Sequence, residues 1–101
     1  MIDISVLHQD LIHKILQRHV PGCEVRVFGS RVGPKAKKYS DLDLAIIGKE
    51  KIPSHVLAAL KEDFQESDLP FRVDVLDWHV VSEEFKAVIA KKYEILQKSA
   101  A

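Results

Sequence analysis

Two pairs of residues separated by ten positions could together bind a nucleotide and a metal ion. Gly29 and Ser30 follow a run of alternating polarity, and Asp41 and Asp43 come ten residues later. Alternate side chains of a strand share a face, so the two carboxylates should point to the same side, where their charges repel. A divalent cation relieves this repulsion, because Mg²⁺ prefers oxygen ligands and commonly takes one or two carboxylates together with substrate phosphates.

The glycine–serine pair suits the phosphate side of such a site. A glycine at a strand end allows close backbone approach, and free N–H groups at the start of a helical turn attract an anion. The Ser30 hydroxyl can donate a hydrogen bond to a phosphate oxygen, and Arg31 or Lys35 could add positive charge. The alternatives are a plain turn for Gly29 and Ser30, a structural ion pair for Arg31 and a solvated loop for the lysine.

A third carboxylate, Asp74, lies in a later apolar run that spans residues 71–78. In a strand its side chain faces away from Val73 and Val75. Three carboxylates beside a phosphate cradle suit two-metal nucleotidyl transfer, in which one ion activates the attacking hydroxyl and the other neutralises the triphosphate. Asp74 would belong mainly to the nucleophile side. Asp77, on the opposite face of this run, could support the site without binding the metal directly, but it is predicted to be a strand-end cap or a solvated residue.

The elements that must position these residues follow from hydrophobic periodicity. Apolar spacing predicts helices over residues 5–19, 53–67 and 82–96, strands over 24–28, 41–47 and 71–78, and a short helical turn from residue 30. The first helix is expected to bury Leu7, Leu11, Ile12, Ile15 and Leu16, and the last one Phe85, Val88, Ile89, Tyr93 and Leu96. The order α-β-α-β-α-β-α predicts an α/β fold with helices packed against a sheet, and the strand pairing stays open.

Composition excludes several other classes of protein. The chain has 101 residues with 15 basic and 15 acidic side chains, which predicts a single domain over residues 1–101 and zero net charge. Neutrality argues against nucleic-acid binding by bulk electrostatics, so no DNA partner is expected. The single cysteine excludes an internal disulfide, and no apolar run is long enough to cross a membrane. A reduced, cytoplasmic protein is therefore expected.

Three segments carry a resemblance to a known family. Phe28-Gly29-Ser30-Arg31, then Ser40-Asp41-Leu42-Asp43-Leu44, and finally Phe71-Arg72-Val73-Asp74-Val75 resemble the signature of the DNA polymerase beta-type nucleotidyltransferases. The whole chain is similar to the smallest members, the minimal nucleotidyltransferases (MNT) encoded beside HEPN-domain partners. One departure is Pro34 after Gly33, where many members continue with a basic residue.

The resemblance implies a fold, a site and a reaction. It implies a small mixed β-sheet, Gly29, Ser30 and Arg31 on the nucleotide, and Asp41, Asp43 and Asp74 as the catalytic and metal-binding residues, with two Mg²⁺ ions and ATP as substrate. It further implies an antitoxin that transfers AMP to a hydroxyl, most simply a tyrosine, of a cognate HEPN toxin in a hetero-oligomer. The alternatives are a non-catalytic antitoxin that acts by steric binding, or transfer to a small molecule or an RNA end.

Overall fold

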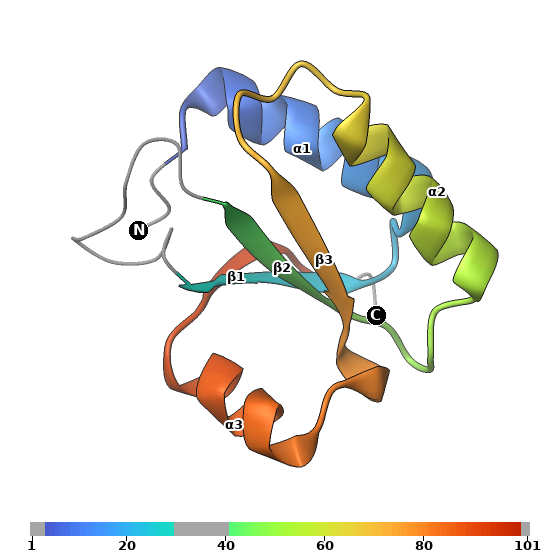
Figure 1. The fold of residues 1–101 in the computed structure, drawn as a ribbon, viewed down its shortest axis with the longest axis vertical. Coiled ribbons are helices and arrows are strands. Elements are labelled where there is room, and N and C mark those ends of the chain that lie inside the picture. Colours follow the sequence, from blue (N-terminus) through green and yellow to red (C-terminus); the bar gives the residue numbers. More distant parts are fainter. Residues whose placement is uncertain (1–3, 30–40, 100–101) are drawn as a thin grey trace.

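The structure, a computed structural model, describes residues 4–29 and 41–99 (Figure 1). Within these ranges the elements run in the order α1 (Val6–His19), β1 (Glu24–Phe28), β2 (Leu42–Ile47), α2 (Ser54–Gln65), β3 (Val73–Asp77), the 3-10 helix η2 (Trp78–Val80), α3 (Glu83–Lys91) and β4 (Glu94–Gln97). The predicted α/β class is confirmed. The helical turn predicted from residue 30 lies outside the described residues.

The helices begin where the capping residues place them. The hydroxyl of Ser5 accepts a hydrogen bond from the His8 N–H at 3.3 Å, at the start of α1. The hydroxyl of Ser82 accepts one from the Phe85 N–H at 3.2 Å, at the start of α3. Each bond satisfies a backbone donor that the first helical turn leaves free. Serine is among the preferred N-cap residue types, so the two helix starts follow from local sequence.

The four strands form one mixed sheet in the order β3-β2-β1-β4. β2 and β3 run parallel, whereas β1 pairs antiparallel with β2 on one side and with β4 on the other. This order makes β2 the strand between β1 and β3. Asp43 of β2 consequently lies opposite Phe28 of β1 and opposite Asp74 of β3.

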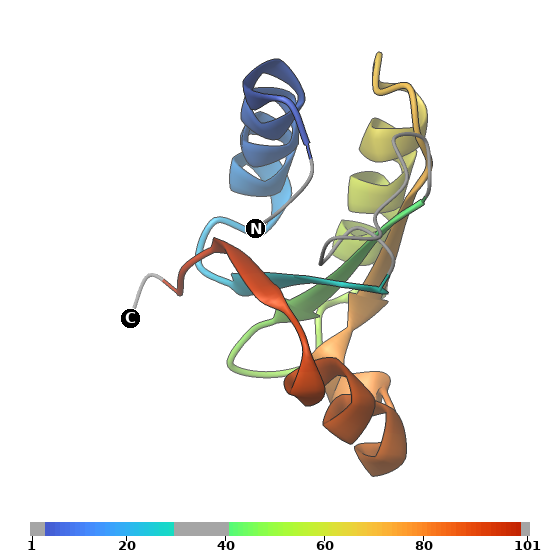
Figure 2. The same ribbon diagram turned by 90° about the vertical axis from the view of Figure 1, so that its left-hand side faces the viewer.

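The two faces of the sheet are covered differently. The face that carries Leu42, Leu44 and Ile46 packs against α1 and α2 in the main hydrophobic core, and these three side chains are fully buried. The opposite face packs a smaller cluster around Phe28, Ala45 and Ile89 under α3. Figure 2 shows the sheet between these layers, with α1 and α2 on one side and α3 on the other.

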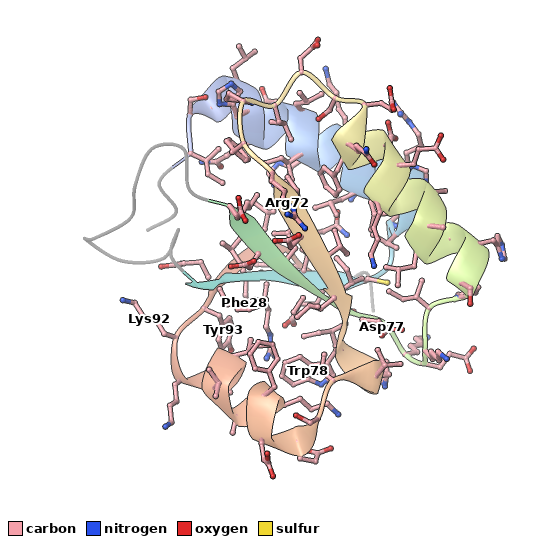
Figure 3. All side chains as sticks on the ribbon, in the orientation of Figure 1. Phe28, Arg72, Asp77, Trp78, Lys92 and Tyr93 are labelled. Atoms are coloured by element: carbon pink, nitrogen blue, oxygen red, sulfur yellow. The ribbon has the colours of Figure 1, made fainter. Side chains whose placement is uncertain are left out.

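One cation helps to hold α3 against its face. The guanidinium of Arg26 lies 4.3 Å from the centre of the Tyr93 ring and 5.1 Å from that of Trp78, and it forms an ion pair with Glu24. Figure 3 shows Trp78 and Tyr93 beside α3. Such cation–π contacts stabilise a partly desolvated arginine, so Arg26 ties β1 to the segments that flank α3 at both ends.

The predicted last helix is too long. α3 ends at Lys91, the backbone is extended at Lys92, and residues 94–97 form β4 instead of another helical turn. The pairing partner decides this outcome, because β4 covers the edge of β1 and its Gln97 side chain donates 2.8 Å hydrogen bonds to the carbonyls of Val20 and Cys23. The apolar spacing within residues 82–96 carries no information about these contacts, because they are made with distant segments.

Some predicted stripe residues are not in the core. Leu7, near the start of α1, is 76% exposed, although Ile12, Ile15 and Leu16 are buried as expected. On α3 only Ile89 is buried, whereas Val88 is 57% exposed. Val88 directly precedes the buried Ile89, so its exposure reflects the side of α3 on which it lies. Among the described residues, no helix is both long enough and apolar enough to cross a bilayer.

Candidate active site

The candidate site lies on the α3 face of the sheet, where three segments meet. Asp43 and Asp74 occupy the same register position of the parallel β2–β3 pair, and both side chains are half-buried. Both carboxylates lie on the face of the sheet opposite to the buried Leu42 and Leu44, as the alternation along a strand predicts. Two of the three predicted carboxylates are therefore neighbours across a pair of strands that are more than 25 residues apart in sequence.

The third acid, Asp41, precedes β2 and is exposed. The negative charge of Asp41 nevertheless affects the pKa of Asp43. Burial raises the pKa of Asp43 above its usual range, and the nearby carboxylates of Asp74 and then Asp41 raise it further. The structure thus brings the three acids close enough for mutual repulsion, with Asp43 at the centre. Repulsion of this kind is relieved by a bound cation or by a proton.

Gly29 adjoins this acidic group from the side of β1. Its φ is +81°, the conformation that glycine adopts without a Cβ penalty. A Cβ built at Gly29 would lie only 2.4 Å from Oδ2 of Asp43, so this backbone approaches the carboxylate more closely than any other residue type allows. The neighbour that requires a glycine here is thus the Asp43 side chain, and the predicted contact of Gly29 with a phosphate stays a prediction. Ser30 and Arg31, the other two nucleotide-binding predictions, lie outside the described residues.

Arg72 is a neighbour of the site that the motif analysis missed. Its Nε donates a hydrogen bond to Oδ1 of Asp74 at 3.1 Å, and its side chain is largely exposed at the start of β3 (Figure 3). The sequence spacing could have indicated this contact, because Arg72 and Asp74 are two residues apart and such residues share a face of a strand. Arg72 thus places a positive charge next to Asp74.

Asp77 does not belong to this group. It is buried on the opposite face from Asp74, where its two oxygens accept hydrogen bonds from the N–H groups of Ile52, at 2.9 Å, and His79, at 3.0 Å. The predicted strand-end cap is confirmed, since the second bond caps η2. The alternative of a solvated residue is wrong, because Asp77 is only 2% exposed.

A cleft of about 940 Å³ opens beside the acid pair and follows the edge of β3. Asp43, Asp74, Phe28 and Phe85 line it on the α3 side of the sheet. The remaining lining residues come from α2 and from β3 with the segment before it, namely Lys61, Phe64, Gln65, Leu69, Phe71, Arg72, Val73, Val75 and Leu76. Sequence reasoning did not find the α2 contribution, because no motif links Lys61 or Gln65 to the acids.

The donor set fits a hard divalent cation in its chemistry. Half-buried carboxylates that repel one another are oxygen ligands, and the Gly29 backbone lies directly against one of them. Within residues 4–29 and 41–99, no three His, Cys, Asp or Glu side chains already stand as a closed coordination set. An arrangement of one carboxylate pair with an exposed third acid is consistent with a site in which substrate oxygens supply further ligands.

Three comparisons relate the chain to known proteins. Residues 10–100 match the family described as polymerase beta, nucleotidyltransferase. A probable protein adenylyltransferase MntA of Haemophilus influenzae is 50% identical over 97 residues, which cover 96% of this chain and 85% of that protein. The match to the family extends over all three candidate carboxylates and Gly29.

Solved structures show the same fold. A toxin–antitoxin structure with AMP-PNP superposes with a TM-score of 0.74 at 20% identity, over 91% of this chain and 74% of the other. A tri-AMPylated HEPN toxin of Shewanella oneidensis in complex with MNT antitoxin gives a TM-score of 0.69 at 21% identity, over 92% and 71% of the two chains. At these identities the likeness concerns the arrangement of helices and strands.

Proposed function

Because this chain belongs to the polymerase beta nucleotidyltransferase family, we propose that it transfers AMP from ATP to a tyrosine hydroxyl of a cognate HEPN-domain toxin and thereby acts as an antitoxin. One observation carries the proposal: Asp43 lies between Asp74 and Gly29, with its pKa raised by burial and by the neighbouring acids. The named activity of the half-identical MntA relative and the AMPylated HEPN complex support the choice of nucleotide and acceptor.

The proposed step exchanges one P–O bond for another. The acceptor oxygen attacks the α-phosphorus of ATP, the bond from that phosphorus to the β-bridging oxygen breaks, and pyrophosphate leaves. The hydroxyl proton passes to Asp74 or to solvent. Asp41, Asp43 and Asp74 would hold two Mg²⁺ ions, which when bound lower the pKa of the hydroxyl and neutralise phosphate charge. ATP is a cytoplasmic metabolite, so we assign the reaction to the cytoplasm.

The chain's own residues contribute positioning and electrostatics. Asp43 and Asp74 are fixed by a shared ladder position, so a ligand between them is oriented by two strands rather than by a loop. Gly29, Ser30 and Arg31 would hold the phosphates on the β1 side, where a glycine allows close approach of the backbone to an anion. Phosphoryl transfer depends mostly on such positioning, so no covalent nucleophile is needed.

The direct test is intact-mass analysis of the partner. The protein is incubated with Mg-ATP and the HEPN-domain protein encoded beside it, and the partner's mass is measured with time. The expected result is a gain of one or more adenylyl groups that requires both Mg²⁺ and ATP. An unchanged mass for a correctly folded pair at several concentrations would contradict transfer to this partner.

A double variant separates catalysis from neutralisation by binding alone. Asp41→Ala with Asp43→Ala removes two acids and leaves the buried Leu42 and Leu44 in place. The expected result is loss of transfer and loss of protection in cells that express the toxin, with complex formation retained. Protection equal to that of the unchanged protein would instead assign neutralisation to steric binding.

A further inference from the structure

The sheet order divides the space around Asp43 into two sides. On the β1 side, Gly29 approaches the carboxylate so closely that a Cβ would lie 2.4 Å from Oδ2. On the β3 side, Asp74 lies opposite Asp43, and the cleft begins there. We place the phosphates on the glycine side, because a glycine at a strand end lets backbone N–H groups come close to an anion. The cleft along β3 is therefore left for the other reactant.

Along the outer edge of β3, backbone N–H and C=O groups point away from β2, beside the cleft. The carbonyl of Arg72 accepts a hydrogen bond from the Leu42 N–H at 2.8 Å, so the backbone of Arg72 faces β2. In a parallel ladder alternate residues face the same neighbour, so Asp74 also faces β2. The N–H and C=O groups of Val73 and Val75 accordingly point to the opposite edge, where the described sheet has no further strand.

The cleft also has an apolar wall and a polar rim. Phe64, Leu69 and Phe71 form an apolar surface next to the edge of β3. Exposed Lys61 and Gln65 of α2 stand at the rim. Ligand pockets are usually lined by apolar and aromatic side chains with a few polar groups, and an apolar wall of this kind is compatible with an aromatic ring.

We propose that the cleft along β3 is the acceptor subsite, in which a segment of the partner protein lies against the outward-facing backbone of Val73 and Val75 and directs its aromatic hydroxyl toward Asp74. The inference rests on the proposed function, which supplies a protein acceptor. It adds that the two reactants enter from opposite sides of Asp43: the nucleotide past Gly29, and the acceptor past Gln65 and Lys61 of α2.

A bulky side chain at the rim tests this division. Gln65→Trp places an indole in the cleft, whereas Glu62→Trp puts the same side chain at another exposed position of α2 that does not line it. For each variant we would measure the KM for the HEPN-domain partner, the kcat, and the Kd for Mg²⁺ with a non-hydrolysable α,β-substituted ATP analogue. The melting temperature of each variant verifies its folding.

The expected result for Gln65→Trp is a KM for the partner raised about tenfold or more, with the nucleotide Kd unchanged, while Glu62→Trp behaves as the unchanged protein. A raised nucleotide Kd with an unaltered acceptor KM would assign the cleft to the nucleotide and overturn the inference. If Gln65→Trp changes neither the KM for the partner nor the Kd for the nucleotide, the inference is overturned as well. If the unchanged protein itself fails to modify the partner, the proposed function has failed and the inference falls with it.

Amide hydrogen exchange provides a second, independent reading. With partner bound, the amides of Val73 and Val75 should exchange at least tenfold more slowly, whereas that of Asp74, already directed toward β2, should change little. Equal exchange rates with and without partner, under conditions in which modification proceeds, would contradict docking along β3 and leave the transfer reaction intact.

Discussion

Asp43 illustrates how one residue acquires its properties from neighbours on three segments. The chain places a carboxylate at the second position of an apolar strand, and the sheet then sets Asp74 and Gly29 on either side of it. Burial and the like charges raise its pKa, so the folded protein holds its proton more tightly than the unfolded chain does. This destabilising environment is useful only where a cation or substrate is to be bound.

The pH dependence of stability should reveal this repulsion. A carboxyl whose folded pKa is raised above the unfolded value of 3.8 contributes stability below that pH, and this contribution is lost as the pH rises through the folded pKa. In Asp43→Asn the side chain cannot ionise, so the variant does not lose this stability as the pH rises. Urea denaturation in EDTA should therefore find the variant more stable than the unchanged protein at pH 7 and equal to it near pH 3. Asp68→Asn, an exposed site, is the matched control.

A reversed order at pH 7, with Asp43→Asn the less stable protein in EDTA, would contradict the electrostatic account. It would mean that the carboxylate makes favourable contacts that outweigh its repulsion from Asp74 and Asp41.

Gly29→Ala should be costly, and Gly22→Ala should not. At Gly29 the added Cβ meets Oδ2 of Asp43 at 2.4 Å and the φ of +81° disfavours any L residue, whereas at Gly22 nothing lies within 4 Å. The left-handed conformation alone costs about 1–2 kcal/mol. We expect a lower melting temperature and weaker nucleotide binding for the first variant only. Equal effects at both glycines would contradict the close approach.

At the scale of elements, short segments at the edges of the sheet position the site. β3 is an edge strand that carries Asp74, and β4 covers the other edge beside β1. β4 has only four residues, yet its Leu96 is buried and its Gln97 reaches across to the turn between α1 and β1. The strand thereby fixes β1, which ends at Gly29.

Gln97→Ala should test the contribution of β4. The substitution leaves the carbonyls of Val20 and Cys23 without the side-chain donors that they now have, each at 2.8 Å. Loss of a partner for a buried polar group costs about 1–3 kcal/mol, and chemical denaturation should show a decrease of that size. Lys98→Ala, at the exposed neighbouring position, should leave stability nearly unchanged. A neutral Gln97→Ala would show that these bonds are replaced by water.

At the scale of the molecule, the unequal covering of the two sheet faces leaves room for a site. α1 and α2 bury one face completely around Leu44 and Leu60, while α3 covers only part of the other. The acids lie on this second face, next to the cleft that follows β3. Stability is thus concentrated on one face of the sheet and the proposed chemistry on the other.

Ligand binding should stabilise the whole fold through these acids. A ligand at a hundredfold excess over its Kd adds about 2.7 kcal/mol, and each kcal/mol raises the melting temperature of a domain of this size by about 4–8 °C. Mg²⁺ with a non-hydrolysable ATP analogue should give such a rise in the unchanged protein. In Asp43→Asn the rise should disappear. An equal rise in both would show that the nucleotide binds elsewhere.

Local patterns in the sequence were sufficient to predict most elements and to propose the candidate acids. β1 was predicted with the bounds that the structure shows, because strict alternation of polarity in a strand is read directly from neighbouring residues. The caps at Ser5 and Ser82 are equally local. The turn at Gly29 is also a local signal, whereas its packing against Asp43 depends on the pairing of β1 with β2.

Contacts between distant segments required the tertiary structure. The sequence by itself determined that Asp41, Asp43 and Asp74 were candidates, but only the parallel pairing of β2 with β3 set Asp43 beside Asp74. The same holds for β4, whose strand conformation depends on a free edge of β1, and for the cleft, whose wall comes from α2. Periodicity reports the environment of a segment's own faces, whereas these features depend on which surface another segment leaves uncovered.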